Sequence, residues 1–317
     1  MAAGRLRSLA KRALGRVPID YRHASDPDPG PEPLMGPVDI VVPVYGAAAE
    51  LERCAASLLL HTDLGRDRVV VVLDGPGQAE AEAVVARLAE RAGAEAVLVL
   101  RNPERRGFPA TANRGMAASR RDVILLNSDT VVTAGWVDKL RAAAASSRAV
   151  ATVTPFSNNA TICSLPEFLR PNPVPAGLSI DDFARLVDAC SAREYPRLPT
   201  GVGVCLYVKR RVLDEVGCFD EEAFGLGYGE ENDLCMRATK AGFVHVLDDA
   251  TFIFHEGQSS FGSTRDERLV AGERALKRRH PEYIPTIAAF IREDPLRPCR
   301  ERVMAGLLAR PASDDGH

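Results

Sequence analysis

The sequence lacks a long apolar run and a strong imbalance of charge. None of its apolar runs approaches the roughly 18 residues that would span a bilayer. Its 40 lysines and arginines nearly cancel its 43 aspartates and glutamates, for a formal net charge of -3, whereas nucleic-acid-binding proteins usually carry a basic surplus. Basic residues also interrupt the apolar core that a secretory signal requires near the N-terminus. We therefore expect a cytoplasmic or peripheral protein with no nucleic-acid partner.

The cysteines lack any spacing that favours a disulfide framework or a zinc site. No C-x-x-C pair occurs among the seven, and structural zinc sites usually contain such short spacings. We expect reduced thiols, mostly buried, and no zinc. The cysteines are Cys54, Cys163, Cys190, Cys205, Cys218, Cys235 and Cys299.

An alternation of apolar runs and helical patterns fills the first half of the chain. The runs are rich in β-branched residues and apolar on both faces, which is typical of parallel strands covered by helices. We predict a Rossmann-like, mostly parallel sheet flanked by helices, an α/β fold that binds a nucleotide. The strand-like runs are VDIVVPVY, RVVVVLD, AEAVLVL and DVILLN, and the helices are expected at residues 50–61, 78–92, 108–119 and 136–145.

The pattern loosens in the second half but still predicts regular elements. Residues 156–175 are rich in proline and indicate a loop, and residues 225–229 form a glycine-rich loop. Acidic residues open the helix that follows this loop, where the helix dipole favours them. Helices are predicted at 179–191, 210–216, 230–241 and 267–281, and strands at 201–209 and 243–249, followed by the segment FIFHEGQSSFG.

The two ends of the chain differ from its middle. Residues 1–25 carry a cluster of basic residues interleaved with leucines, which fits either an amphipathic helix on an anionic membrane or a solvated arm. Residues 26–37 hold five prolines and two glycines and indicate a linker. The tail beyond Arg310 is predicted to be disordered.

Polar residues follow several of the strand-like runs directly. Asp74 follows VVVVL, Asp129 follows VILLNS, and His255 follows TFIF, while the acidic cluster of residues 230–233 follows the glycine-rich loop. Each alone has a structural explanation, as a turn residue, a helix cap, a buried histidine or a solvated helix start. Because the ends of parallel strands open on one edge of a sheet, these side chains can converge there.

The chemistry of such a group is that of transfer from a diphosphate donor. A carboxylate and an imidazole that leave coordination positions open suit Mn²⁺ or Mg²⁺, whose remaining ligands are diphosphate oxygens and water. The ion would stabilise a leaving nucleoside diphosphate as a Lewis acid. A second carboxylate could deprotonate an acceptor hydroxyl, with its pKa tuned by burial beside another acid.

Six ordered blocks together give the chain a family resemblance. It resembles the inverting nucleotide-sugar glycosyltransferases of family 2, which have the GT-A fold, over residues 38–262. The resemblance implies one catalytic domain, with a nucleotide-binding half at 38–130, an acceptor half at 131–262, and a helical extension at 263–317. The blocks are VDIVVPVYG, VLDG, RNPERRGFPATANRGM, LLNSDT, GYGEENDLCMRATKAG and HEGQSS.

The resemblance also implies the substrates. The donor would be a nucleoside-diphosphate sugar bound with a divalent metal, Mn²⁺ or Mg²⁺. The acceptor would be a hydroxyl on a glycan, such as a bacterial cell-surface polysaccharide, or on a lipid-linked precursor, and contact with a membrane through residues 1–25 would suit a lipid-linked acceptor.

The resemblance assigns roles at the donor end. The end of the first strand, Pro43, Val44 and Tyr45, would cradle the nucleoside. Asp74 would hydrogen-bond the base, and Arg106 is a weaker candidate for contact with the base or the phosphates.

The D-x-D element of the family matches Asn127, Ser128 and Asp129 in this chain. Asn127 would sit near the ribose and Asp129 would ligate the metal, whose site His255 would complete. Asn127 departs from the aspartate often found at its position, which removes one negative charge but no expected metal ligand.

The E-D element maps to Glu230 and Glu231, and Glu231 is then the candidate general base. A glutamate in place of the commoner aspartate lengthens its reach by one methylene. Glu230 and Asp233 remain alternative bases. Gly201 and Gly203 fall where the acceptor side of the cleft begins, with their roles open.

Two other classes of function compete with a glycosyltransferase. A nucleotidyltransferase typically needs a basic, glycine-rich phosphate loop near the first strand, but VVPVYGAAAE has no lysine or arginine. The lack of G-x-G-x-x-G there also argues against a dinucleotide-dependent oxidoreductase. A catalytically silent nucleotide-sugar-binding protein would be expected to have lost Asp129, Glu231 or His255, and all three are present.

Overall fold

A computed structural model describes residues 18–22, 27–34, 36–118, 120–257 and 265–310. In these residues the strands form one nine-stranded sheet in the order β3-β2-β1-β4-β8-β6-β9-β5, with β7 paired to β9. The strands are β1 (Asp39–Val44), β2 (Arg68–Leu73), β3 (Val97–Arg101), β4 (Val123–Leu126), β5 (Thr130–Val131), β6 (Val150–Ser157), β7 (Arg197–Leu198), β8 (Cys205–Val208) and β9 (Val244–His255).

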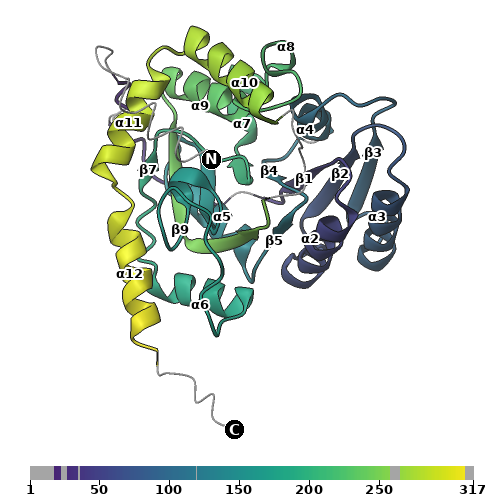
Figure 1. Cartoon of the computed structure of the whole chain (residues 1–317), viewed down its shortest axis with the longest axis horizontal. Coiled ribbons are helices and arrows are strands. Elements are labelled where there is room, and N and C mark those ends of the chain that lie inside the picture. The colour runs from purple at the N-terminus through teal and green to yellow at the C-terminus, as the bar shows by residue number, and fades with distance from the viewer. Residues whose placement is uncertain (1–17, 23–26, 35, 119, 258–264, 311–317) are drawn as a thin grey trace.

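Helices cover both faces of the sheet and continue beyond its last strand (Figure 1). The helices α5 and α7 have the bounds that the sequence predicts. The helical elements are α2 (Ala48–His61), α3 (Ala79–Ala92), α4 (Phe108–Ala117), α5 (Trp136–Ala145), the 3-10 turn η1 (Thr161–Cys163), α6 (Ile180–Cys190), α7 (Arg210–Val216), α8 (Glu221–Phe224), α9 (Glu230–Lys240), α10 (Arg265–Arg279), α11 (Tyr283–Glu293) and α12 (Arg297–Leu308).

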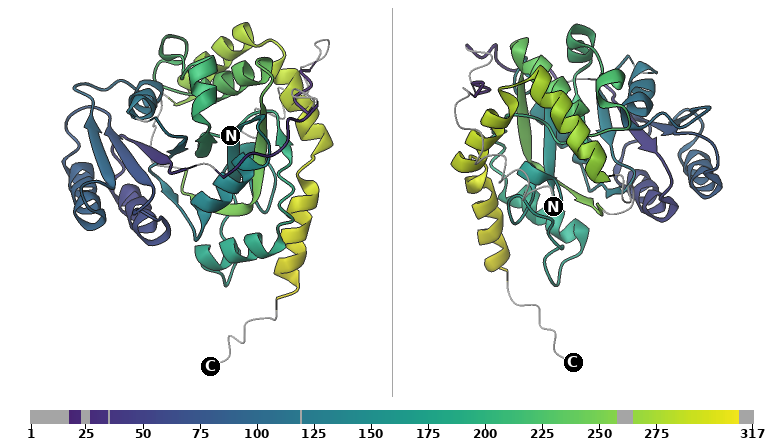
Figure 2. Two further views of the ribbon diagram at one scale, coloured as in Figure 1. Left: turned by 180° about the vertical axis from the view of Figure 1, so that it is seen from behind. Right: turned by 45° about the horizontal axis from the view of Figure 1, so that its top comes forward.

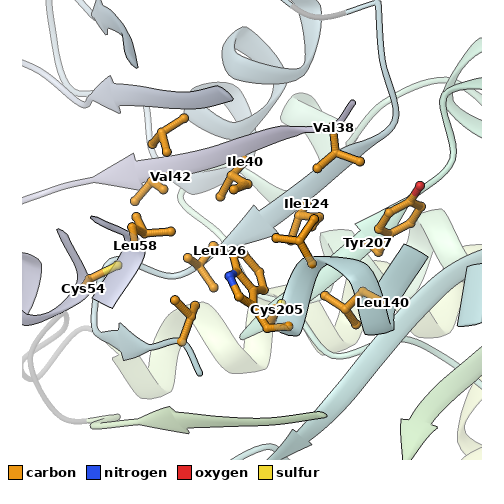
Figure 3. Close-up of a cluster of buried hydrophobic side chains, with 14 of the residues drawn as sticks. Val38, Ile40, Val42, Cys54, Leu58, Ile124, Leu126, Leu140, Cys205 and Tyr207 are labelled. Atoms are coloured by element: carbon orange, nitrogen blue, oxygen red, sulfur yellow. The ribbon is translucent and has the colours of Figure 1, made fainter. Parts of the chain in front are cut away.

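The first four strands form the parallel unit that the sequence predicts. β1 pairs in parallel with β2 and β4, and β2 pairs in parallel with β3. Because successive side chains of a strand point to opposite faces, Ile40 and Val42 join the core with α2, α3 and α5, whereas Val41 packs with α4 on the other face. Figure 3 shows the first of these cores, with Leu58 of α2 beside the strand residues. The predicted α/β fold is confirmed.

The second half of the sheet is mixed rather than parallel. β8 runs antiparallel to both β4 and β6, while β6 is parallel to β9. The predicted strand at 201–209 is shorter in the structure, because only Cys205–Val208 pairs. β9 is one strand of 12 residues, where the sequence indicates a strand followed by a separate segment. Register shifts between β6 and β9 accommodate the acidic pair Asp248 and Asp249 within it.

The C-terminal helices share a core with the sheet. Phe290 of α11 and Val303 of α12 belong to the buried cluster that contains Phe183 of α6 and Phe252 of β9. Both views in Figure 2 place α11 and α12 on the opposite side of the molecule from α2 and α3. The sheet therefore has one side formed by β1 to β3 and another side that the C-terminal helices cover.

The N-terminal segment lies against the domain. Residues 27–34 form no helix or strand, in agreement with their proline content, but they contact the folded domain. Glu32 pairs with the buried ammonium group of Lys209, and its N–H donates to the carbonyl of Ala145. Closer to the N-terminus, the N–H of Ile19 donates to the side-chain hydroxyl of Thr286 of α11. The amphipathic arm is predicted over residues 1–25, of which only 18–22 are described, and these form no helix. Residues 1–17 and the predicted disordered tail, residues 311–317, lie outside the described residues.

The described residues contain no helix that is both long and apolar enough to cross a membrane. All seven cysteines lie within the described ranges as free thiols, and five of them are buried, as the sequence predicts. Burial raises the pKa of Cys54 to about 12, so this thiol stays protonated at neutral pH.

Candidate active site

A cavity of about 460 Å³ opens at the carboxyl ends of the parallel strands. The loops after β1, β2 and β4 form one end of it, and the first turn of α9 with residues of α10 and α11 forms the other. Of the predicted site residues, those that line the sheet end include Tyr45, Asp74, Asn127, Asp129 and His255.

Asp74 is buried and binds the loop that follows β3. The backbone N–H groups of Arg106 and Gly107 donate to its two carboxylate oxygens at 2.8 and 2.9 Å, and the Asn102 amide donates at 2.9 Å. Three donors to one buried carboxylate fix the loop firmly. Asp74 therefore shapes the floor of the cavity, in addition to the contact with a base that the sequence predicts for it.

The neighbouring arginines of this loop point in different directions. The guanidinium group of Arg105 lies over the Tyr45 ring, 3.8 Å from its centroid, and both residues line the cavity. Arg106, the residue that the sequence favours, pairs at 3.1 Å with Glu221 of α8 and is not among the described residues that line the cavity. The structure thus places Arg105 at the cavity, a residue that sequence reasoning missed.

Asp129 and His255 meet through the antiparallel pairing of β5 and β9. Nε2 of His255 lies 3.3 Å from Oδ2 of Asp129. Nδ1 of His255 lies 2.8 Å from the carbonyl of Asn159, which can only accept, so Nδ1 carries a proton and Nε2 faces the carboxylate. Burial alone would raise the pKa of Asp129, but His255 outweighs it and the pKa is lowered. The carboxylate is therefore ionised at neutral pH.

This pair has the donor set for a hard divalent cation with open positions. An oxygen and an imidazole nitrogen that face each other can bind one ion, and the carbonyl of Asn159 orients the imidazole from its far side. Within the described ranges no three histidine, cysteine or acidic side chains gather as a closed metal site. Asp129 and His255 thus fit an ion whose remaining ligands come from a bound substrate.

The first turn of α9 brings two glutamates to the other end of the cavity. Both Glu230 and Glu231 line it. Oε2 of Glu230 is buried, with no hydrogen-bond partner in the part of the chain that the structure describes. Burial raises the pKa of both carboxyls, and the charge of Glu231 raises that of Glu230 further. Glu230 therefore holds a proton more readily, and Glu231 ionises first.

Asp233, the third candidate base, faces the other way. It is fully buried and accepts from Arg237 and Arg279 at 2.8 Å and from His280 at 2.9 Å. Burial opposes its ionisation, but the interactions with these partners outweigh that effect and lower the pKa of Asp233 to about 2. Asp233 is not among the described residues that line the cavity. Its contacts join α9 to α10 instead.

Glycines allow the loops around the cavity to approach closely. Gly107 has φ +86°, and a Cβ there would lie 2.7 Å from Cα of Leu226 in the glycine-rich loop, so a larger residue would push this loop away. Gly201 and Gly203 both line the cavity, and a Cβ on Gly203 would lie 3.7 Å from Cγ of Glu231. The sequence leaves the roles of both glycines open. In the structure, the absence of a side chain at Gly203 leaves space beside Glu231.

The fold is that of the GT-A class of glycosyltransferases. The family model described as glycosyl transferase family 2 matches residues 39–217, more than half of the chain. The chain belongs to this family and is a glycosyltransferase. No curated protein sequence matches it.

Two solved structures show the same fold at low sequence identity. The mannosyltransferase PcManGT from Pyrobaculum calidifontis, in complex with GDP-Man and Mn²⁺, has a TM-score of 0.58 at 19% identity; the match covers 100% of this chain and 85% of that chain. GalNAc-T7 with UDP, GalNAc and Mn²⁺ has a TM-score of 0.58 at 16% identity, over 87% of this chain and 55% of the other.

Proposed function

We propose that the chain is an inverting, metal-dependent glycosyltransferase that moves a sugar from a nucleoside diphosphate to a hydroxyl acceptor. The observation that carries this proposal is the content of one cavity. It holds the pair Asp129 and His255 at its sheet end and the glutamates Glu230 and Glu231 at its helical end. An ion-binding pair and a candidate base in one cavity suit a single displacement at a sugar carbon.

The sheet end suits the donor. Pro43, Val44 and Tyr45 offer the nucleoside a surface at the end of β1, Asn127 lines the cavity where it would contact the ribose, and Arg105 adds positive charge. Asp129 and His255 would hold Mn²⁺ or Mg²⁺, which when bound supplies Lewis-acid stabilisation of the diphosphate leaving group. The two solved relatives were crystallised with Mn²⁺ and nucleotides, which supports this reading.

The helical end suits the acceptor. Glu231 takes the proton from the acceptor hydroxyl as its oxygen forms a bond with the anomeric carbon. The bond from that carbon to the diphosphate oxygen breaks at the same time, and the electron pair leaves with the nucleoside diphosphate. One displacement inverts the anomeric configuration.

Glu231 suits the role of base better than its neighbours. A base needs a pKa near the working pH, and burial raises that of Glu231 from its ordinary value. Asp233, with a pKa of about 2 and three donors, is too weak a base and is already engaged. Glu230 keeps its proton and cannot accept another.

We propose a cytoplasmic or peripheral location, with the acceptor a glycan or a lipid-linked hydroxyl. The five cations of residues 1–17 support contact with an anionic membrane surface. Removal of residues 1–17 tests this contact without disturbing Ile19, which binds α11. Sedimentation with anionic vesicles should fall after the removal, and unchanged sedimentation would take the arm out of the proposal.

The experiment that tests the function is a panel of nucleoside-diphosphate sugars, with Mn²⁺ or with a chelator. A donor that binds only the folded state raises the melting temperature according to its affinity. We expect at least one donor to stabilise the protein, more so with Mn²⁺, and to be slowly hydrolysed or transferred. Tight binding with no turnover of any donor would favour a catalytically silent binding protein.

A further inference from the structure

At the helical end of the cavity, one wall is formed by apolar side chains of the C-terminal helices. Leu276 of α10 and three residues of the first turns of α11, Tyr283, Ile284 and Ile287, pack into one apolar cluster, and all four line the cavity. Leu269 adds to this wall from the same face of α10 as Leu276, because residues seven apart in a helix lie on one side. This apolar wall belongs to the C-terminal helices and not to the sheet.

The apolar wall begins next to the candidate base. The Tyr283 hydroxyl donates to Asn232 at 2.9 Å, and Asn232 directly follows Glu231. Ile284 and Ile287 continue the wall away from this point along α11. A group bound on the wall would therefore be attached close to the hydroxyl that Glu231 deprotonates.

Gly272 brings α10 to this position. A Cβ at Gly272 would lie 1.9 Å from the carbonyl oxygen of Tyr228, so only glycine lets the helix lie against the glycine-rich loop. Tyr228 itself has φ +80°, which is costly for a residue with a side chain. The close approach fixes the apolar wall and the first turn of α9 in one arrangement.

The charge around the apolar wall is negative. The acidic side chains that can carry this charge are Glu231 and Glu273, which line this end of the cavity beside the protonated Glu230. Lys277 pairs with Glu273 at 2.5 Å and offsets its charge in part. Among the described residues that line the whole cavity, the only lysine or arginine is Arg105, at the sheet end. A phosphate on the acceptor side would meet repulsion in a partly desolvated site.

From these features we propose that the acceptor is an uncharged amphiphile. Its reactive hydroxyl lies at Glu231, and an apolar alkyl or aryl group within a few bonds of that hydroxyl packs on Leu269, Leu276, Ile284 and Ile287. An acceptor with a phosphate next to the reacting sugar, as in a lipid phosphate, does not fit. The proposal rests on the proposed function, because it places the acceptor relative to the base of that reaction.

Calorimetry with simple amphiphiles tests the proposal on the full chain. The probes are methyl β-glucoside, octyl β-glucoside below its micelle concentration, and octyl phosphate, each titrated with Mn²⁺ and the nucleoside diphosphate of the best donor present. We expect octyl glucoside to bind at least about tenfold more tightly than methyl glucoside, which corresponds to two buried methylenes. Octyl phosphate should bind at least about tenfold more weakly than octyl glucoside.

Variants locate the effect on the apolar wall. Ile284→Asn and Leu269→Gln, on two different helices and both half-buried, should each remove most of the advantage of the octyl chain. Leu60→Gln is the matched control, because Leu60 is 73% exposed on α2. Glu273→Gln should strengthen octyl phosphate binding severalfold and leave octyl glucoside unchanged.

The outcomes separate this proposal from the proposed function. Equal affinity for methyl and octyl glucoside, or an octyl advantage that both wall variants retain, would overturn the apolar wall as acceptor site. Octyl phosphate binding as tightly as octyl glucoside would point to a lipid phosphate instead. Nucleoside diphosphate binding is measured in the same samples, and its absence would count against the proposed function. In that case the comparison of methyl and octyl glucoside can be repeated on the protein without nucleotide.

Discussion

The carboxyl groups on the two sides of the first turn of α9 have pKa values shifted in opposite directions. On the side that faces α10, Asp233 has two arginines and a histidine within 2.9 Å, and its pKa falls to about 2. On the side that faces the cavity, Glu230 and Glu231 have raised pKa values, caused first by burial. The difference teaches that burial alone does not set the pKa of an acid, because the cationic partners of Asp233 reverse the effect of its burial.

Glu231→Gln gives the sharpest test of the cavity side. A glutamine keeps the shape of the side chain but cannot take a proton, so transfer should fall about 10²-fold or more, as the loss of a general base predicts. Affinity for the nucleoside diphosphate, measured by calorimetry, should not change. Glu222→Gln, at an exposed residue of α8, is the control. Full turnover in Glu231→Gln would move the base to another residue.

Asp233→Asn tests the opposite side. The pKa of Asp233 is lower in the folded state than the usual 3.8, so its ionised form stabilises the fold above that pH, and the stabilisation is lost as pH falls toward 2. We expect the asparagine variant to lose about 2 kcal/mol of unfolding free energy at pH 7, measured in urea. The exposed Asp214→Asn variant should lose almost nothing. An equal loss in both variants would show that the arginine contacts add little.

Asp248 in β9 extends the comparison to a buried carboxyl group that is not among the described residues lining the cavity. It is fully buried, and burial raises its pKa to about 6. A raised pKa means that folding favours the protonated acid, so stability is highest below the unfolded value near 3.8 and falls as pH rises through 6. Asp248→Asn should therefore stabilise the protein by on the order of 1 to 2 kcal/mol at pH 8. The gain should shrink toward pH 4, and a constant gain across pH would argue against titration of this residue.

Asp129→Ala tests the sheet end of the cavity. If Asp129 holds the ion, the increase in nucleoside diphosphate affinity that Mn²⁺ causes should drop about tenfold or more, because even indirect partners of a metal often contribute that much. Affinity without Mn²⁺ should change little. Undiminished metal dependence would remove Asp129 from the ion site.

Much of the fold could be predicted because the apolar pattern determines it. The four parallel strands follow from short apolar runs rich in β-branched residues, and helices α5 and α7 follow from the helical spacing of their apolar residues. The sequence predicts the strand through Asp248 and Asp249 but did not reveal that β9 continues beyond them to His255. The resemblance implies a helical extension over residues 263–317 but does not locate α11 within it. Pro285 stands in the first turn of α11, a position at which proline is tolerated because the N–H that it lacks would have no partner within the helix.

The site could be predicted where it depends on strand ends. Asp74, Asp129 and His255 lie at the cavity because the sheet brings their strands to one edge. Side-chain direction within a loop could not be predicted in the same way: Asp74 binds the N–H groups of Arg106 and Gly107, and this turn leaves Arg105 at the cavity. The apolar wall was equally hidden, because nothing local to α11 indicates that it packs beside a residue some 50 positions earlier.

The pairing of Glu32 with Lys209 limits where the chain can be shortened. The Lys209 side chain is 1% exposed, and burial already lowers its pKa. Without Glu32 the buried amine would keep the carbonyl of Ser147 as an acceptor but would lose its counter-charge, and its neutral form would be favoured further. For fusions and chimaeras the usable N-terminal limit therefore lies ahead of Glu32, before the first strand.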